Sequence, residues 1–279
     1  MRLYAAYEQF AVDLVASWLA GLPTLFPLYA SLPDVIRRNH CSGTAHILPK
    51  AGQGRYDHLS VTTVIGSLNN GLAGVVPYSF CVETFLIQDQ NLRSNTLDQL
   101  FAKVGVEHCW GWISSHPKME RFVTDEVGGT ETAESLLKSL VDYRNEAAHG
   151  EVANVLDVGP LTQLCNFVQI LCESLAERVE REYINAELNI GTAVEAGVAI
   201  GSYQNNAIVV RTNEPTFYCG QKLAVMGERY CFNVTIEEIQ LDRFVVDNVM
   251  AAQNAEIGLR CDSPIPKNAK LLIRRASEE

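Results

Sequence analysis

Leu140-Val-Asp-Tyr-Arg-Asn-Glu-Ala-Ala-His-Gly150 closes a predicted amphipathic helix, for which Thr130 or Thr132 is a suitable N-cap. The apolar stripe of this helix, continued beyond Val141 in steps of three and four residues, reaches Arg144. A guanidinium on the buried face of a helix is costly unless it is paired or faces a wet crevice. The helix therefore carries a charge that its own packing does not explain.

Arg144 and His149 are the residue types that phosphodiester chemistry needs. Arginine binds phosphate through two parallel hydrogen bonds and offsets charge that develops in the transition state. Histidine takes a proton from an attacking hydroxyl at neutral pH, and in RNA the neighbouring 2′-hydroxyl can attack, so that no metal is needed. The two side chains lie roughly 140° apart around an ideal helix. They can meet across a two-fold dimer or where the helix ends, and Asn145 could orient either one.

A purely structural role is the alternative. Arg144 would then form a buried pair with Asp142, Glu146 or a more distant carboxylate. His149 would cap the C-terminus of the helix, where the helix dipole favours a cation. Spacing alone favours this alternative, because structural ion pairs are more common than functional sites.

Helical periodicity continues on both sides of this segment. The first helix is predicted over Leu3–Trp18 and stops at Gly21-Leu-Pro23, and a second covers Leu25–Arg38. Further helices are predicted over Leu97–Val104 and from Pro160 to Leu188. The apolar stripe of the last helix is close to heptad spacing, which favours packing against another helix in the same or a second chain.

After Gly191 the pattern changes to short β-branched runs separated by turns. The predicted strands are Val198–Gly201, Ala207–Arg211, Lys222–Met226, Cys231–Leu241, Arg243–Val249, Glu256–Cys261 and Lys270–Arg274. This spacing predicts a compact β-barrel of about 80 residues. The expected fold class is α+β, with a helical domain over residues 1–190 and a small β-barrel domain over residues 191–279.

The composition narrows the classes of function that this protein can have. The 279 residues are 47% hydrophobic and 20% charged, which excludes a disordered chain, and the net charge of −11 excludes a general duplex DNA binder. Leu14–Pro33 is uncharged, but Pro23 and Pro27 would break a membrane-spanning helix, so we expect no membrane segment. The eight cysteines are dispersed, contain no C-x-x-C pair and lie mostly in apolar settings. They indicate reduced, buried thiols in a cytoplasmic protein.

Arg144-Asn-Glu-Ala-Ala-His149 matches the R-x4-6-H motif, with a polar residue after the arginine, of the HEPN superfamily (higher eukaryotes and prokaryotes nucleotide-binding). The ending Arg-Asn-x-x-Ala-His-Gly resembles the MAE-like branch most. The resemblance covers roughly residues 1–190. It extends to the aromatic-rich first helix and to Asn91-Leu92, followed by a helix ending in Gly105-Val106.

The resemblance implies an all-α homodimer, or a higher oligomer, in which Arg144 and His149 of both subunits line one cleft. It implies a metal-independent, cofactor-free endoribonuclease, often a toxin or antiphage effector, that leaves a 2′,3′-cyclic phosphate and a 5′-hydroxyl. Arg144 would bind the scissile phosphate, His149 would act as base or acid, and Asn145 would assist. Some superfamily members do not cleave, so a non-catalytic scaffold or RNA-binding subunit of a defence or regulatory complex is the alternative. One subgroup carries a tyrosine that a partner nucleotidyltransferase modifies; here Glu151 takes that position.

Three segments of the C-terminal part resemble the second domain of elongation-factor-Tu-type GTPases. They are Cys219–Gly227, Glu256–Cys261 and Pro266–Ile273. Such barrels contact RNA or act as docking modules, so we expect the barrel to bind the RNA target, a protein partner or an inhibitor.

Two other clusters are weaker candidates. His40-Cys41 with His46 lacks the four closely paired ligands of a structural zinc site. His108-Cys109, beside Trp110 and Trp112, could form a thiol site or a stacking platform, although aromatic residues at this spacing are more often one core and one surface residue.

Overall fold

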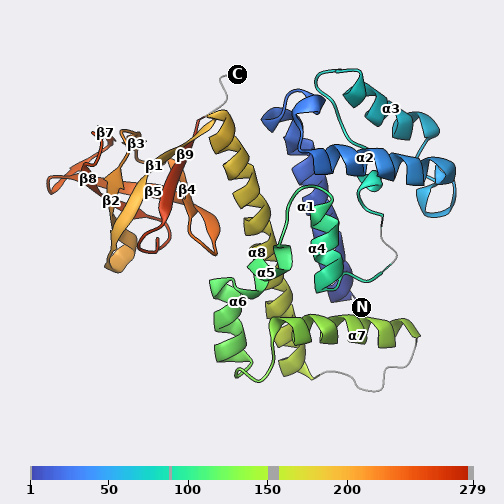
Figure 1. Ribbon diagram of the computed structural model, residues 1–279. Helices are drawn as coiled ribbons and strands as arrows, with labels where there is room; N and C mark the ends of the chain where they lie inside the picture. Colours follow the sequence, from blue (N-terminus) through green and yellow to red (C-terminus); the bar gives the residue numbers. More distant parts are fainter. Residues whose placement is uncertain (1, 88–89, 150–156, 276–279) are drawn as a thin grey trace. The chain divides into compact units, whose positions relative to one another are not determined.

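The computed structural model describes residues 2–87, 90–149 and 157–275 (Figure 1). The chain separates into two compact units, Met1–Val179 and Glu180–Glu279. The boundary falls inside the long helix α8 (Val158–Ile190), whereas the sequence predicted it at the end of that helix. The last turns of α8 group with the barrel because Arg274 contacts two of their carboxylates. Its Nη1 lies 2.7 Å from Oε1 of Glu180, and its Nε lies 2.6 Å from Oε2 of Glu187.

The first unit is helical, as predicted. Its α-helices, besides the first part of α8, are α1 (Arg2–Leu25), α2 (Asp34–Ile47), α3 (Val61–Leu72), α4 (Ser94–Ala102), α5 (Cys109–Ser114), α6 (Pro117–Arg121) and α7 (Ala133–His149). Short helical turns are η1 (Tyr29–Ser31), η2 (Leu48–Lys50), η3 (Gly54–Tyr56), η4 (Val82–Thr84) and η5 (Phe122–Glu126). Figure 1 shows α7 beside the N-terminal end of α1, while α2 and α3 lie toward its C-terminal end.

The predicted ends of the first two helices were wrong. Helix α1 continues through Pro23 to Leu25, because a proline in the last turn removes only one hydrogen bond while Leu22 and Leu25 become buried. The next helix does not start at Leu25. Pro27 disfavours helical geometry at the residue before it, and α2 begins only after Pro33, then continues past the predicted end to Ile47.

The helix that carries the motif and the helix that follows it were predicted correctly. Helix α7 starts after Thr132, whose Oγ1 accepts a hydrogen bond of 3.1 Å from the backbone N–H of Ser135. Helix α8 buries the central part of its predicted stripe, with Leu171 and Leu175 fully inaccessible to solvent. These residues form the packed interior against which the shorter helices are held.

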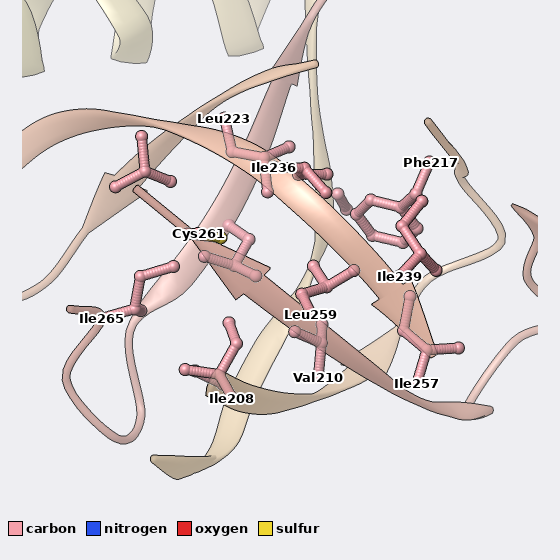
Figure 2. Packing of buried hydrophobic residues seen from close by; sticks show 14 of the residues in the cluster. Ile208, Val210, Phe217, Leu223, Ile236, Ile239, Ile257, Leu259, Cys261 and Ile265 are labelled. Atoms are coloured by element: carbon pink, nitrogen blue, oxygen red, sulfur yellow. The ribbon is translucent and has the colours of Figure 1, made fainter. Parts of the chain in front are cut away.

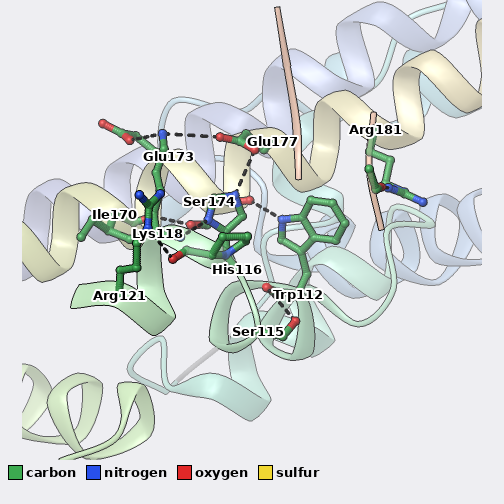
Figure 3. A network of polar contacts seen from close by, with 12 residues as sticks. Trp112, Ser115, His116, Lys118, Arg121, Ile170, Glu173, Ser174, Glu177 and Arg181 are labelled. Carbon is green, nitrogen blue, oxygen red and sulfur yellow. Dashed lines mark hydrogen bonds and ion pairs between the residues drawn. The ribbon is translucent and has the colours of Figure 1, made fainter. Parts of the chain in front are cut away.

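A polar network joins α5 and α6 to α8 (Figure 3). The indole N–H of Trp112 donates to the carbonyl oxygen of Ser174 at 2.9 Å. Nε2 of His116 lies 3.0 Å from Oε2 of Glu177, while its Nδ1 accepts from a backbone N–H, so the proton of the neutral ring is on Nε2. Through these bonds, the polar groups at the helix junction have hydrogen-bond partners in the interior.

The second unit is an antiparallel barrel. Its strands are β1 (Ala193–Ser202), β2 (Ala207–Thr212), β3 (Thr216–Tyr218), β4 (Lys222–Met226), β5 (Cys231–Leu241), β6 (Phe244–Val246), β7 (Asn248–Met250), β8 (Glu256–Cys261) and β9 (Lys270–Arg274). The order β4-β9-β1-β2-β8-β5 is closed by pairing of β5 with β4, so six strands of the described chain form the barrel. Strand β6 extends the edge of β5, and β3 pairs with β7.

The barrel interior is apolar (Figure 2). In β8 the side chains of Ile257, Leu259 and Cys261 are each 1% exposed, while the residues between them are more accessible. This is the alternation that the sequence predicted for a half-buried strand. The predicted run Arg243–Val249 is divided between β6 and β7, and the three-residue strand β3 was not predicted.

Two further expectations concerned membrane-spanning helices and the burial of the cysteines. In the described part of the chain, no helix has both the length and the apolar character to cross a bilayer. All eight cysteines are thiols outside any disulfide, but the prediction that they are mostly buried was only half right. The exposed ones are Cys41, Cys165 and Cys219.

Candidate functional site

Arg144 lies where the buried stripe of α7 reaches the surface. Val141, one turn earlier, is completely buried, whereas Arg144 is half-buried. Its guanidinium carbon lies 5.7 Å from the centre of the Tyr4 ring of α1, within the range of a cation–π contact. The aromatic face therefore supports the charged group from the inner side.

Tyr4 also holds the segment that precedes α4. It is 2% exposed, and its hydroxyl oxygen accepts a hydrogen bond of 2.7 Å from the backbone N–H of Leu92. Burial raises the pKa of Tyr4, so the phenol stays neutral at physiological pH. One buried side chain thus fixes α1, the start of α4 and the outer end of α7 relative to one another.

Asn145 connects Arg144 to the same segment. Its Oδ1 accepts a hydrogen bond of 3.2 Å from Nη1 of Arg144 and another of 3.0 Å from Nδ2 of Asn91. All three side chains are half-buried. With its oxygen accepting two bonds, Asn145 holds the guanidinium from one side and keeps its own Nδ2 as a donor.

One of the two carboxylates nearest to Arg144 along the chain pairs with a different arginine. Oδ1 of Asp142 lies 3.2 Å from Nη2 of Arg93, and both side chains are nearly half exposed. Within the described residues, no carboxylate lies at salt-bridge distance from Arg144. Among the described residues, Arg144 therefore pairs with neither Asp142 nor Glu146, nor with a more distant carboxylate, and the half-buried cation keeps its capacity to bind an anion. The capping role considered for His149 lies outside the described residues.

His149 is the last residue of α7, and its side chain lies outside the described residues, as do Gly150 and Glu151. The structure therefore brings Arg144 and Asn145 together and leaves the relation of His149 to them as a prediction.

Sequence reasoning gave no role to Tyr4 or Asn91. Asn91 appeared only in the Asn91-Leu92 pair of the family resemblance, and no local pattern points to Tyr4 apart from the aromatic character of α1. The contacts that these residues make with α7 join positions far apart in the chain, which no spacing rule reveals.

The other sequence candidates do not form a second site: His40 and Cys109 are buried, whereas Cys41, His46 and His108 are exposed. His40 is fully buried, with Nδ1 3.0 Å from the Tyr29 hydroxyl and Nε2 3.3 Å from Oγ of Ser67. Burial lowers the pKa of His40 to about 4. Cys109 is also fully buried, which removes it as a reactive thiol. Among residues 2–87, 90–149 and 157–275, no three histidine, cysteine or acidic side chains lie close enough together to hold a metal ion.

Comparison with known proteins identifies the helical unit. The model of the family described as RiboL-PSP-HEPN matches residues 1–181. The curated proteins include no sequence that matches the chain.

Similarity to solved structures is low. Two crystal structures of the C-terminal domain of a Geobacillus thermoleovorans protein described as a U32 peptidase are 19% and 17% identical. Each aligns over 29% of this chain and over 99% and 91% of its own length, with a TM-score of 0.26. A flavohemoglobin from Malassezia yamatoensis is 9% identical over 86% of this chain and 64% of its own, with a TM-score of 0.15. At these TM-scores the similarities have no bearing on function.

Proposed function

Because the chain belongs to the RiboL-PSP-HEPN family through residues 1–181, we propose that it is a metal-independent endoribonuclease that acts at Arg144. Membership of the HEPN superfamily supports a role in cleaving or binding RNA. The observation that carries the proposal is the half-buried guanidinium of Arg144, which Asn145 and Tyr4 orient and which has no carboxylate at salt-bridge distance in the described part of the chain. A preorganised cation of this kind binds a phosphate and stabilises the charge that develops on it during transfer.

The proposed reaction uses the RNA's own 2′-hydroxyl. His149 takes the proton from this hydroxyl as its oxygen attacks the adjacent phosphorus, and the bond to the 5′-oxygen breaks. The 5′-oxygen receives a proton from solvent water, which leaves a 2′,3′-cyclic phosphate and a 5′-hydroxyl, and His149 then returns the proton it took to solvent. Arg144 holds the non-bridging oxygens, and Asn145 keeps Arg144 in place.

Two copies are needed in this proposal because of helix geometry. Five residues along one helix place Arg144 and His149 roughly 140° apart, which is too far for both to face one phosphate. Across a two-fold axis, Arg144 of one copy can face the partner's His149. The cleft is then composite and cannot form in a monomer.

The charge of the chain fits a selective enzyme. The net charge of −11 repels RNA from most of the surface, so approach depends on the local cation and on salt. We propose that the β-barrel recruits the RNA target, a protein partner or an inhibitor, and that the protein acts in the cytoplasm as a toxin or antiphage effector.

The experiment is cleavage of a mixed RNA pool with EDTA present. Arg144→Ala should lower the rate by about 100- to 1,000-fold, the usual cost of removing one transition-state donor. His149→Ala should also inactivate the enzyme. Arg38→Ala, an exposed arginine of the same unit, is the matched control and should cleave at the wild-type rate. Cleavage that survives Arg144→Ala at the wild-type rate would refute the proposal.

Mixing tests the composite cleft. Arg144→Ala supplies an intact His149, and His149→Ala supplies an intact Arg144, so an equimolar mixture should regain activity that neither variant has. If the mixture stays inactive while mixed dimers form, Arg144 and His149 do not work across the interface.

A non-catalytic RNA-binding subunit is the second candidate. It is favoured because Arg144 and Asn145 offer only hydrogen-bond donors to a ligand, since the Asn145 oxygen already accepts two hydrogen bonds. Donors of this kind can bind a phosphate without cleaving the RNA. In that case the wild type binds RNA with an affinity that depends on Arg144 but leaves the RNA intact.

A further inference from the structure

Helix α3 presents an apolar stripe to solvent. Val61, Ile65, Leu68 and Leu72 recur at intervals of four, three and four residues, which places them on one face; we call this the α3 stripe. Val61, Ile65 and Leu72 are 51%, 45% and 67% exposed. The buried residues of α3 are Val64, Ser67 and Gly71. The stripe is therefore a second apolar face that the fold of one chain does not cover.

The apolar surface extends beyond the helix. Leu28 is 59% exposed, and Val75 and Val76, just after α3, are 46% and 59% exposed. Gly71 of α3 packs against the ring of Tyr29, where an added Cβ would lie 2.6 Å from a ring carbon, so the segment around Leu28 is held beside the stripe. Together these side chains present on the order of 500 Å² of apolar surface, the size of the largest apolar patch on a typical monomer, which often has a function.

The α3 stripe itself carries no charge, although Asp34, Arg37 and Arg38 of α2 line a cavity together with Leu72. Residues 59–82 contain no acidic, basic or histidine side chain, in a chain whose net charge is −11. A helix that lies on a membrane surface normally has lysine or arginine on its polar face, and α3 has none. Two acidic copies repel one another at long range, so a stable contact between them is best made where no excess of acidic side chains is brought together; beside the α3 stripe, Asp34 is paired with Arg37, and Arg38 is basic.

We propose that the α3 stripe packs against the α3 stripe of a second copy of this chain. A stripe with near-heptad spacing is self-complementary across a two-fold axis, because each apolar ridge can pack beside its equivalent. Two copies would bury on the order of 1,000 Å², at the lower end of specific protein interfaces. Ile65 and Leu68 lie at the middle of the stripe and therefore nearest to the axis.

The stripe is separate from the site at Arg144. Tyr4, which contacts Arg144, and Leu25 stand near opposite ends of α1, about 30 Å apart at 1.5 Å per residue. The α3 stripe lies at the Leu25 end, where η1 meets α3. Pairing through α3 is thus a second interface, distinct from the composite cleft, and it holds whether or not the protein cleaves RNA.

The test is the mass of the purified full-length protein at about 50 μM, a concentration at which typical specific complexes form. Ile65→Asp places two carboxylates across the two-fold axis, so it should halve the wild-type mass and weaken association about 100-fold. Ile65→Lys should do the same, and an equimolar mixture of the two variants should regain the wild-type mass because opposite charges then face each other. Met250→Asp, at an 83% exposed residue of the barrel, is the control and should leave the mass unchanged.

Three results would overturn the proposal: a wild type that is monomeric at this concentration, an Ile65→Asp variant with the wild-type mass, or a mixture that does not re-associate. Circular dichroism confirms that each variant is folded. RNA cleavage, measured on the same samples, reports separately on the site at Arg144, so that failure of one proposal is distinguishable from failure of the other.

Discussion

His40 should make the stability of the helical unit depend steeply on pH. The ring is completely buried, and the neutral form satisfies both nitrogens: Nδ1 accepts from the Tyr29 hydroxyl, and Nε2–H donates to Ser67, whose own hydroxyl donates to the Val64 carbonyl. The Phe80 ring meets the His40 ring edge to face, with centroids 5.0 Å apart. A proton on this histidine would be neither solvated nor paired with a carboxylate.

The magnitude follows from the pKa. Burial lowers the pKa of His40 from 6.5 to about 4. In the unfolded chain, His40 therefore becomes protonated near pH 6.5, whereas in the folded chain it stays neutral down to about pH 4. The contribution of neutral His40 to the free energy of unfolding is complete above pH 6.5 and decreases as the pH falls from 6.5 to about 4. At 1.36 kcal/mol per pH unit, the loss is about 3 kcal/mol.

Urea unfolding at several pH values between 7 and 4 measures this loss. Other titrating groups cancel when wild type is compared with His40→Gln, which can hydrogen-bond but does not titrate. The difference in unfolding free energy between the two should change by about 3 kcal/mol, against the wild type, from pH 7 to pH 4. His46→Gln, at an exposed histidine of the same helix, is the control and should keep the wild-type slope. A constant difference between wild type and His40→Gln would refute the reasoning.

Three further predictions concern packing and thiol chemistry. Gly43→Ala should lower the stability of the helical unit by at least about 2 kcal/mol in thermal unfolding, because its Cβ would lie 1.9 Å from the Thr84 carbonyl oxygen; an unchanged melting temperature would contradict this contact. Leu171→Ala should cost about 2–5 kcal/mol, whereas Leu161→Ala, in the same helix but 47% exposed, should cost much less; equal costs in urea unfolding would contradict the assigned face of α8. Cys261 should resist alkylation of the folded protein at pH 8, because burial raises its thiol pKa to about 12; early modification in a mass-spectrometric time course would contradict this. The exposed thiols at Cys41, Cys165 and Cys219 should react first.

The sequence predicts the long elements of this fold well. The helices around the motif have several turns of regular apolar spacing and a clear N-cap, so their pattern outweighs local ambiguity. Strands β4, β5, β8 and β9 have the predicted bounds because alternation and turn residues agree there. The prediction fails at Pro23, where burial of neighbouring leucines outweighs the loss of a hydrogen bond, and at β3, which is too short to show a period.

The candidate site is predictable only in part. Arg144 is conspicuous because it interrupts an apolar stripe, and this is visible in any helical projection. The side chains that surround Arg144 in the folded protein are not visible in such a projection. Tyr4 and Asn91 reach Arg144 and Asn145 through contacts that exist only once α1, α4 and α7 have packed. The pairing of Asp142 with Arg93 is equally non-local, and it gives Asp142 a partner other than Arg144.

The hydrogen bonds of Asn145 have a practical consequence for anyone who handles the protein. If Arg144 and Asn145 bind the scissile phosphate as proposed, their guanidinium and amide N–H groups would also bind small tetrahedral oxyanions, because these donors distinguish ligands only by geometry and charge. Sulfate or inorganic phosphate in a buffer would then compete with RNA for the same donors. Choice among RNA molecules cannot come from these donors, and must be made by surfaces that contact bases or the fold of the RNA.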